Sequence, residues 1–394
     1  MTAAHGHFWA KGEEHLAEPL TCADGRVEIR VGDCRDLLRA MPDQSVQCVV
    51  TSPPYFGLRD YGTARWEGGD AECDHRHQLG GEGATSAKQN TSAGMQSVQY
   101  QKVCRKCGAN RQDGQIGLEP TPAEYVAEMV AVFREVWRVL RDDGTVWLNL
   151  GDSYSTGSNN TSSHKDGSKQ KSNTGTQFDY VRKPPIGLSP KNILGIPWRV
   201  AFALQDDGWY LRQDIIWSKS NPMPESVKDR CTKAHEYLFM LSKRARYFYD
   251  AEAIREKATL RNTFETGNLE YSDGACRNDN SPGSNLRIDR DYRNKRSVWT
   301  IATHSFSGAH FATFPPALVE PCILAGSPKG GVILDPFGGA GTTGLVAARH
   351  GRKAILCELN PDYAEMAHRR ISEEWREPVI QPIDDYGPLF KVAP

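Results

Sequence analysis

Short apolar strands alternate with amphipathic helices along most of this chain. Alternating β-branched residues predict a strand over 27–31, and apolar runs predict strands over 45–50 and 145–150. Residues 121–140 have the apolar spacing of a helix, with Thr121 as its cap. Further strands are expected over 210–217, 236–241, 332–334 and 353–357, and further helices over 36–41, 193–204, 316–325, 342–349 and 362–371. This order predicts an α/β fold, with a mostly parallel sheet and helices on both faces.

Three polar stretches interrupt the alternation. Residues 61–117 and 250–300 are predicted to be insertions, and 153–190 is predicted to be a flexible loop. The remaining segments form one large domain over 20–60, 118–250 and 300–380. Within it, Asp142-Asp143-Gly144 is predicted to turn the chain before the next strand begins.

The composition is that of an ordinary soluble protein. Of the 394 residues, 39% are hydrophobic and 25% are charged, and the net charge of −1 gives no general signal for nucleic-acid binding. No apolar run has the length of a membrane span, and residues 1–11 lack the apolar centre of a signal peptide. We therefore expect a cytoplasmic protein with no membrane partner, whose ten cysteines are reduced.

A glycine-rich turn near the C-terminus has the form of a nucleoside-binding loop. The strand at 332–334 runs into Asp335-Pro336-Phe337-Gly338-Gly339-Ala340-Gly341-Thr342-Thr343, and a helix follows. Glycines permit a tight turn and the close approach of a ligand, and the helix start attracts a carboxylate. The next strand ends in Glu358, where an acid commonly binds ribose hydroxyls. A purely structural glycine turn is the alternative.

A second motif, Thr51-Ser52-Pro53-Pro54-Tyr55, lies near the N-terminus directly after an apolar strand. Two prolines cannot continue a central strand, so the motif sits just past its carboxyl end, where α/β sheets bind ligands. The Ser52 hydroxyl and the Pro53 carbonyl are suited to holding a planar amine, and Tyr55 can stack on the ring that carries it. An ordinary turn is the alternative.

Together the two motifs resemble the DNA amino-methyltransferases that use S-adenosylmethionine. The likeness extends to Gly151-Asp152-Ser153, Trp217-Ser218-Lys219 and residues 235–242. The catalytic motif comes first and the cofactor motif last, as in the circularly permuted beta class. The resemblance implies a Rossmann-like methyltransferase fold, with a seven-stranded sheet that contains one reversed strand. It also implies that the target base is flipped out of double-stranded DNA.

The resemblance assigns expected roles to individual residues. Ser52, Pro53, Pro54 and Tyr55 form the catalytic turn. Cofactor contacts are expected from Asp335, Phe337, Gly338, Gly339 and Gly341, from Thr342 or Thr343 at the cofactor carboxylate, from Glu358 at the ribose, from Asp33 near the adenine and from Asp152 at the methionine end. The first motif residue in this family is often Asp or Asn in adenine-N6 enzymes and Ser in cytosine-N4 enzymes, so Ser52 favours cytosine N4.

Other activities remain as alternatives. Adenine-N6 methylation uses the same mechanism. A catalytically silent DNA-binding protein and an RNA or protein methyltransferase are further possibilities. Cytosine-C5 methylation requires a cysteine nucleophile, and the single Pro-Cys pair, Pro321-Cys322, falls within a predicted helix.

The first insertion carries metal-ligand residues. Cys104-Arg105-Lys106-Cys107-Gly108 is typical of a zinc knuckle, and Cys73 with His75 completes four ligands, with His77 as the alternative to His75. Such a polar segment has little core, so we expect a structural zinc ion that stabilises it. Four unlinked residues on a flexible insertion are the alternative.

DNA contacts are expected from basic residues in the second insertion and from one lysine within the large domain. These are Lys219, Arg287, Arg290, Arg293, Lys295 and Arg296. A solvated charged surface is the alternative for this run. The predicted protein is nucleoid-associated, has a cognate restriction endonuclease as a possible biological counterpart, and is compatible with either a monomer or a homodimer.

Overall fold

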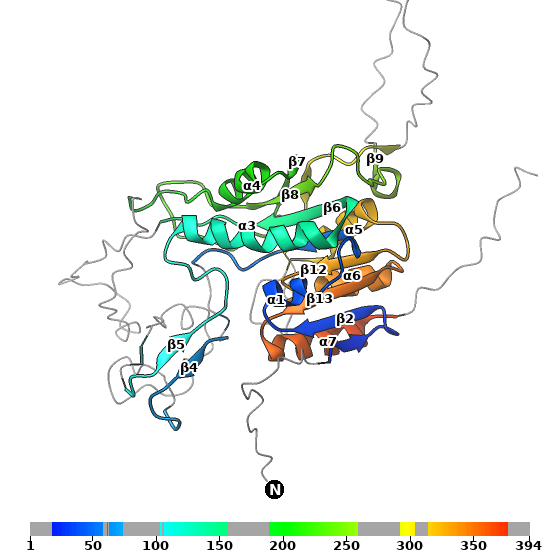
Figure 1. The fold of residues 1–394 in the computed structure, drawn as a ribbon. Coiled ribbons are helices and arrows are strands. Elements are labelled where there is room, and N and C mark those ends of the chain that lie inside the picture. The colour runs from blue at the N-terminus through cyan, green and yellow to red at the C-terminus, as the bar shows by residue number, and fades with distance from the viewer. Residues whose placement is uncertain are drawn as a thin grey trace, which may run out of the picture.

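A nine-stranded sheet crosses the protein in the computed structural model, which describes residues 18–57, 61, 63–73, 103–104, 106–155, 189–258, 292–303 and 314–376 (Figure 1). In spatial order the strands are β1 (Leu20–Cys22), β2 (Val27–Val31), β13 (Lys353–Glu358), β12 (Val332–Asp335), β3 (Val46–Thr51), β6 (Leu140–Leu150), β8 (His235–Ser242), β7 (Tyr210–Ser218) and β11 (Val298–Thr300). Among the described residues, no helix combines the length and apolar character needed to cross a membrane.

The seven central strands have the expected arrangement. Strands β2, β13, β12, β3 and β6 are parallel to one another. Strand β8 runs antiparallel to both β6 and β7, so it is the one reversed strand of the seven. The C-terminal strands β12 and β13 lie between the N-terminal strands β2 and β3. The two sequence motifs therefore reach the same edge of the sheet.

Helices cover both faces, as the sequence predicted. The described helices are α1 (Cys34–Arg39), α3 (Pro122–Val139), α4 (Ile196–Asp206), α5 (Pro316–Gly326), α6 (Thr342–Arg349), α7 (Pro361–Glu374) and the short 3₁₀ helix η2 (Glu252–Ile254). Helices α1, α3 and α4 bury their apolar faces in one core, and α5, α6 and α7 bury theirs in another on the opposite face. Helix α3 begins as expected, because the Thr121 side chain accepts a hydrogen bond from the backbone N–H of Glu124.

The sheet has two strands more than the resemblance implied. Strand β1 adds antiparallel to β2 at one edge, and β11 adds parallel to β7 at the other. Each has three residues, which is too short to show an alternating pattern. Two small sheets lie outside the main one: β4 (Arg65–Glu67) pairs with β5 (Asn110–Gln112), and β9 (Glu256–Lys257) pairs with β10 (Tyr292–Arg293). The sequence predicted no strands in these polar regions.

The turn predicted at Asp142-Asp143-Gly144 lies inside β6. The strand begins at Leu140, and its register against β3 shifts between the Val46–Leu140 and Cys48–Thr145 pairs. Residues 141–144 of β6 lie opposite the single β3 residue Gln47, so the pairing is irregular there although the strand continues. Gly144 suits this position, because a Cβ there would lie 2.5 Å from Leu140 Cδ1.

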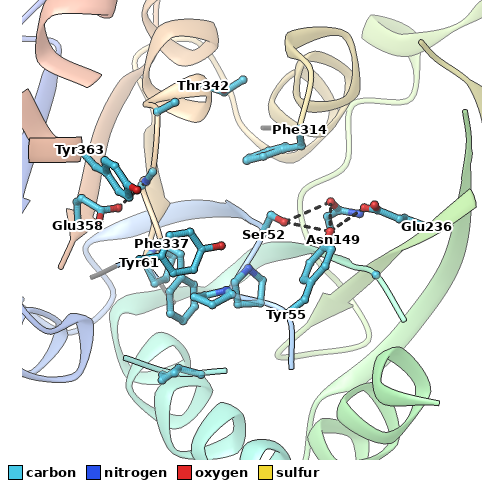
Figure 2. Close-up of a pocket in the computed structure, with 18 of the residues that line it drawn as sticks. Ser52, Tyr55, Tyr61, Asn149, Glu236, Phe314, Phe337, Thr342, Glu358 and Tyr363 are labelled. Carbon is cyan, nitrogen blue, oxygen red and sulfur yellow. Dashed lines mark hydrogen bonds between the residues drawn. The ribbon is translucent and has the colours of Figure 1, made fainter. Parts of the chain in front are cut away.

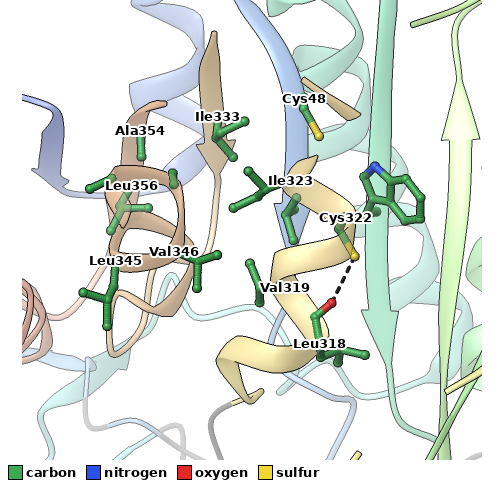
Figure 3. Close-up of a cluster of buried hydrophobic side chains, with 14 of the residues drawn as sticks. Cys48, Leu318, Val319, Cys322, Ile323, Ile333, Leu345, Val346, Ala354 and Leu356 are labelled. Atoms are coloured by element: carbon green, nitrogen blue, oxygen red, sulfur yellow. Dashed lines mark hydrogen bonds between the residues drawn. The ribbon is translucent and has the colours of Figure 1, made fainter. Parts of the chain in front are cut away.

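The Pro-Cys pair lies in the core beneath the sheet, as its helical pattern indicated. Figure 3 shows Cys322 on α5 among apolar side chains of α5, α6 and the central strands. Its thiol is fully buried and donates a hydrogen bond to the Leu318 carbonyl at 3.2 Å. Burial raises the pKa of Cys322 well above its usual value. This thiol is not placed to act as a nucleophile.

Candidate active site

A cavity of about 550 Å³ opens at the carboxyl ends of the central strands. Residues from both halves of the chain line it (Figure 2). Strand ends contribute Gly32 and Asp33 after β2, Ser52 to Tyr55 after β3, Gly151 and Asp152 after β6, Pro336 to Ala340 after β12, and Glu358 at the end of β13. The carboxyl edge of an α/β sheet is where ligands bind. The structure therefore brings the two sequence motifs together at one cavity.

The Ser52–Tyr55 turn is fixed from two directions. The hydroxyl of Thr51, the last residue of β3, donates to Asp335 Oδ1 at 2.6 Å. The phenol of Tyr125 on α3 donates to the Pro54 carbonyl at 2.9 Å. The first bond joins the N-terminal motif to the C-terminal one, and both bonds are buried or partly buried. The turn is thus held rigidly at the cavity wall.

A hydrogen-bond network extends from Ser52 into the protein. The phenol of Tyr55 donates to Glu236 Oε2 at 2.6 Å, and Lys219 forms an ion pair with the other carboxylate oxygen. Asn149 Oδ1 lies 3.1 Å from the Tyr55 oxygen and 3.3 Å from Ser52 Oγ. Figure 2 shows Ser52, Tyr55, Asn149 and Glu236 converging on one side of the cavity. The network connects β3, β6, β7 and β8, so it depends on the assembled sheet.

Burial and the neighbouring carboxylate keep Tyr55 protonated. Burial, with the negative charge and hydrogen bond of Glu236, raises the pKa of Tyr55 well above its usual value. The ring lies flush against the backbone at Gly151, where an added Cβ would be 2.5 Å from Tyr55 Cε2. Tyr55 therefore acts as a hydrogen-bond donor to Glu236, and Gly151 provides the space for its ring.

The Asp335 carboxylate shapes the glycine loop from below. It is fully buried and accepts hydrogen bonds from Thr51, from the Thr343 hydroxyl at 2.7 Å and from the backbone N–H of Phe337 at 3.0 Å. Burial raises the pKa of Asp335 to about 6, against the opposing effect of its hydroxyl donors. Asp335 and Thr343 lie behind the cavity wall, whereas Phe337 lines the cavity.

The glycines of the loop occupy two kinds of position: two line the cavity, and one packs against α7. Gly338 and Gly339 line the cavity, and Gly339 has a φ of +48° and donates its N–H to Glu358 at 2.7 Å. Gly341 lies behind them with a φ of +75°, and a Cβ there would come within 2.9 Å of Ile371 on α7. Thr342 lines the cavity, and its hydroxyl accepts a hydrogen bond from buried Arg370. Arg370 lies on α7 and was not predicted, because no sequence motif marks it.

Glu358 lies on the cavity wall with both carboxylate oxygens engaged by backbone N–H groups. Gly339 donates to Oε2 and Asn360 donates to Oε1 at 2.9 Å. Burial raises the pKa of Glu358 to about 7, although these two donors oppose the shift. A carboxylate oxygen can accept more than one hydrogen bond, so each oxygen retains capacity toward a ligand hydroxyl.

Asp33 and Asp152 reach the cavity while capping helices. The Asp33 carboxylate accepts from the backbone N–H of Arg35 at the start of α1 and forms an ion pair with its guanidinium at 2.5 Å. The Asp152 carboxylate accepts from the backbone N–H groups of Gly195 and Ile196 at the start of α4. Both residues line the cavity, at the strand ends where the sequence placed them.

Three aromatic side chains gather near Glu358, and the sequence singled out only one of them. Figure 2 shows Tyr61, Phe337 and Tyr363 around this carboxylate, and Phe337 alone was predicted. The Tyr61 and Tyr363 rings meet edge to face, with centroids 6.2 Å apart. The Asn360 side chain donates to the Tyr61 carbonyl at 3.0 Å, which ties the first insertion to the C-terminal half. These rings offer faces for a planar heterocycle.

Comparison with known proteins identifies the family. The DNA methylase family model for N6 and N4 enzymes matches residues 46–369. The chain belongs to this family. It is 41% identical over 340 residues to the Type II methyltransferase M.XycI of Xanthomonas campestris pv. cyanopsidis, a match that spans 86% of each chain. It is 39% identical over 344 residues to the Type II methyltransferase M.SmaI of Serratia marcescens, spanning 87% of this chain and 90% of that protein.

A solved structure supports the same fold. The PvuII DNA methyltransferase, described as cytosine-N4-specific, matches with a TM-score of 0.52 at 17% identity, covering 91% of this chain and 94% of that one. The likeness confirms the Rossmann-like methyltransferase fold. The protein is thus an S-adenosylmethionine-dependent DNA amino-methyltransferase of the N4/N6 family, as its motifs indicated.

The methylase also gathers three of the four predicted metal ligands. The Sγ atoms of Cys73, Cys104 and Cys107 lie within 4.8 Å of one another, and those of Cys73 and Cys104 are 3.9 Å apart. The backbone N–H groups of Asp70 and Ala109 donate to Cys107, and these hydrogen bonds lower its pKa. His75, and its alternative His77, lie outside the described residues.

The predicted DNA-binding residues are dispersed. Lys219 belongs to the catalytic network, with its ammonium 4.7 Å from the Trp217 ring centre. Arg293 and Arg296 both donate to Glu256 Oε1, at 2.8 and 2.5 Å. Lys295 lies 4.9 Å from the Trp299 ring centre, and Arg287 and Arg290 lie outside the described residues. A role for these residues in DNA contacts stays a prediction.

Proposed function

We propose that this methylase modifies the exocyclic N4 amine of cytosine in duplex DNA. The observation that carries the proposal is Ser52, which stands at the first position of the catalytic turn and lines the cavity. In the family a serine at this position often accompanies cytosine-N4 specificity. Adenine N6, with the same mechanism, is the alternative target.

The surrounding network supports an acceptor role for the Ser52 oxygen. Asn149 donates its own N–H to the Tyr237 carbonyl at 3.1 Å, which leaves its Oδ1 pointing toward Ser52 and Tyr55. The single Tyr55 hydroxyl hydrogen is taken by the closer Glu236 carboxylate. The Ser52 hydroxyl therefore donates inward to Asn149, and its lone pairs face the cavity.

An amine held there would become a better nucleophile. The nitrogen lone pair of cytosine N4 is delocalised into the ring. Hydrogen bonds from the amine to Ser52 Oγ and to the Pro53 carbonyl favour a tetrahedral nitrogen and aim its lone pair. The base would reach this position by leaving the DNA stack. Ser52 then orients the amine, and the Tyr55–Glu236 pair keeps the turn in place.

The other side of the cavity fits S-adenosylmethionine. Glu358 retains acceptor capacity for two ribose hydroxyls, the loop glycines allow close approach, and the aromatic faces near Glu358 suit an adenine ring. Asp33 would contact the adenine, Thr342 the carboxylate and Asp152 the methionine end. When bound, S-adenosylmethionine supplies the methyl group. The residues of the glycine loop hold and orient it beside Ser52.

Cofactor affinity should depend on pH through Glu358. Its pKa is raised to about 7 in the free protein, and hydroxyl donors bind the ionised form more strongly. Affinity is therefore expected to fall as the pH falls through this pKa, with a Kd about tenfold higher at pH 6 than at pH 8. Calorimetric titration of wild type and Glu358→Gln at each pH isolates this group. Parallel profiles for the two proteins would contradict the assignment.

Gly151→Ala tests the position of the Tyr55 ring. The new Cβ would overlap Tyr55 Cε2, so the ring must move and the bond to Glu236 must weaken. We expect turnover to drop about tenfold or more, because small misplacements at a reacting centre have large effects. Gln205→Ala is the control for general effects of substitution, because Gln205 is exposed on α4 and does not line the cavity. Steady-state methyl transfer to DNA measures both, and an unchanged rate for Gly151→Ala would refute the packing argument.

The target base can be determined directly. The protein is expressed in a host that lacks DNA methylation, and the modified DNA is sequenced by a method that distinguishes N4-methylcytosine from N6-methyladenine. N4-methylcytosine at one recurring site is expected. Finding only N6-methyladenine would reject the cytosine assignment. A silent DNA-binding protein would leave the DNA unmodified and need not bind S-adenosylmethionine. Labelled methyl found in RNA or protein, with none in DNA, would indicate an RNA or protein methyltransferase.

We also propose a structural zinc ion in the first insertion. A tetrahedral ion about 2.3 Å from each sulfur holds the sulfurs about 3.8 Å apart, which is close to the separation of Cys73 and Cys104. The three thiols and the N–H donors around Cys107 match a zinc knuckle, with His75 as the proposed fourth ligand. The ion would tie the paired strands β4 and β5 to the rest of their insertion.

Metal analysis tests this site. Purified protein is expected to carry about one zinc per chain, and Cys104→Ser should lose it and lower the thermal midpoint of unfolding. Cys231→Ser is the matched control, because Cys231 is exposed and outside the cluster. His75→Ala and His77→Ala identify the fourth ligand. Well under one zinc per chain in the wild type would remove the proposal.

The DNA-recognition roles are proposals of the same kind. We propose that residues 250–300 select the target sequence, and that the insertion at 61–117 assists binding. The curated relatives named above are Type II methyltransferases, which supports a cognate restriction endonuclease as biological counterpart. An extract of the source strain should cut unmethylated DNA and spare DNA methylated by this protein. An extract that cuts neither DNA would argue against that partner.

A further inference from the structure

Met223 is exposed at the mouth of the cavity. It lies in the loop between β7 and β8, and together with Pro222 and Pro224 it lines the cavity on the side of the catalytic turn. Its exposed fraction is 80%, the highest among the large apolar side chains in the described part of the chain. A single exposed apolar residue is ordinary in itself. Met223 differs from other exposed apolar residues because it lines the cavity and because other residues hold its loop in place.

The loop is stiff where Met223 stands. The rings of Pro222 and Pro224 fix the φ angles of these two residues, and Pro224 also restricts Met223 to extended conformations. Before them, Asn221 Oδ1 accepts from the backbone N–H of Thr303 at 2.7 Å, and its side-chain amide donates to the Thr303 carbonyl at 3.3 Å. The exposed side chain is therefore presented on a constrained backbone, which reduces the entropy lost when it is buried by a ligand.

The far side of the loop is anchored to the same cavity. Glu225 accepts from Arg230 at 2.7 Å and from the backbone N–H of Lys233 at 3.3 Å. The Lys233 ammonium in turn donates to the Asp152 carbonyl at 2.7 Å. The two stems of the loop carry Lys219 and Glu236, the ion pair that binds Tyr55. Met223 is thus held in a fixed relation to the catalytic turn.

We propose that Met223 inserts into the base stack of duplex DNA, at the place that the target base leaves. This rests on the proposed function, because a base whose amine reaches Ser52 must first leave the helix. The vacated space is lined by the faces of the adjacent bases, and apolar side chains, methionine among them, are known to insert between such faces in architectural DNA-binding proteins. A thioether is polarizable and contacts aromatic rings favourably. Met223 is a positioning residue that stabilises the open duplex.

The test compares two DNA duplexes that carry the site mapped by sequencing. In one the target base is paired, and in the other it faces an abasic site, so extrusion costs little. Met223→Ala is expected to lose about tenfold or more in kcat/KM on the paired duplex and to regain nearly wild-type activity on the abasic one. Phe202→Ala, which removes another exposed apolar side chain from α4 outside the cavity lining, should behave as wild type on both.

A second readout follows extrusion without methyl transfer. With 2-aminopurine at the target position, the wild type should raise its fluorescence on binding, and Met223→Ala should raise it less. Equal losses on both duplexes, or none, would overturn the proposal and would point to a contact with another partner or to no role. Methyl transfer by the wild-type protein shows whether the proposed target base is modified at all. The activity of Met223→Ala on the paired duplex, divided by its activity on the abasic duplex, shows whether Met223 assists base extrusion. The proposed function and the proposed role of Met223 can therefore fail independently.

Discussion

Ser52→Ala is expected to reduce turnover about 100- to 1000-fold while changing cofactor affinity less than twofold. In the proposed mechanism the hydroxyl receives the amine, and alanine would leave a gap in the cavity wall beside Asn149. The glycine loop would be undisturbed, because its link to the catalytic turn runs through Thr51 and Asp335. The rate of methyl transfer should therefore fall while the affinity for S-adenosylmethionine stays nearly unchanged.

Two measurements check this separation. Single-turnover methyl transfer gives the chemical rate, and calorimetry with S-adenosylmethionine gives the affinity. Ser45→Ala is the matched control, because Ser45 precedes the same strand and its exposed hydroxyl donates only to the nearby Pro42 carbonyl among the bonds described. Equal loss of rate and of cofactor affinity in Ser52→Ala would argue that Ser52 holds the turn together and has no direct role.

Glu236→Gln is expected to lower kcat about 10- to 100-fold, with little change in cofactor affinity. A glutamine oxygen can still accept from Tyr55, but the negative charge that pairs with the largely buried Lys219 is lost. Lys219 would then be left without its carboxylate partner, and the ammonium would compete for the same oxygen. The Tyr55 ring and the adjacent turn should become mobile.

Two results decide the role of Glu236: whether kcat falls while cofactor affinity stays unchanged, and whether a conservative variant restores the rate. Glu236→Asp retains the charge and should recover part of the rate, whereas a purely steric role would favour glutamine over aspartate. Glu320→Gln is the control, since Glu320 pairs with His350 on the outer face of α5, remote from the cavity lining. If glutamine at 236 supports full turnover, the Tyr55–Glu236 bond has no part in catalysis.

The main elements were readable from the sequence because their signals are local. Helix α6 has the bounds predicted for it, and α3 begins at its predicted cap. The errors came where tertiary contacts decide the outcome. The irregular segment at 141–144 belongs to β6, where a turn before the strand was predicted, because β3 pairs with β6 on both sides of it. Strands β1 and β11 were missed because three residues carry no periodic signal.

The candidate site was predictable only in part, for the same reason. Ser52, Glu358 and the loop glycines stand in motifs, so their placement at strand ends could be expected. Asn149 and Glu236 lie within strands and look like ordinary members of them. Asn149 reaches Ser52 and Tyr55 across 97 and 94 positions of sequence, and Glu236 reaches Tyr55 across 181. No local pattern marks such residues.

The strand order has a consequence for how the protein is made. Strands β2 and β3 are synthesised early, yet β13 and β12, which lie between them, are synthesised nearly 300 residues later. A nascent chain on the ribosome therefore has a sheet with a gap at its centre and exposed strand edges on both sides of it. It can complete neither core until its last strands emerge. We infer that folding is largely post-translational, and that an unfinished chain cannot methylate the genome of the cell that is making it.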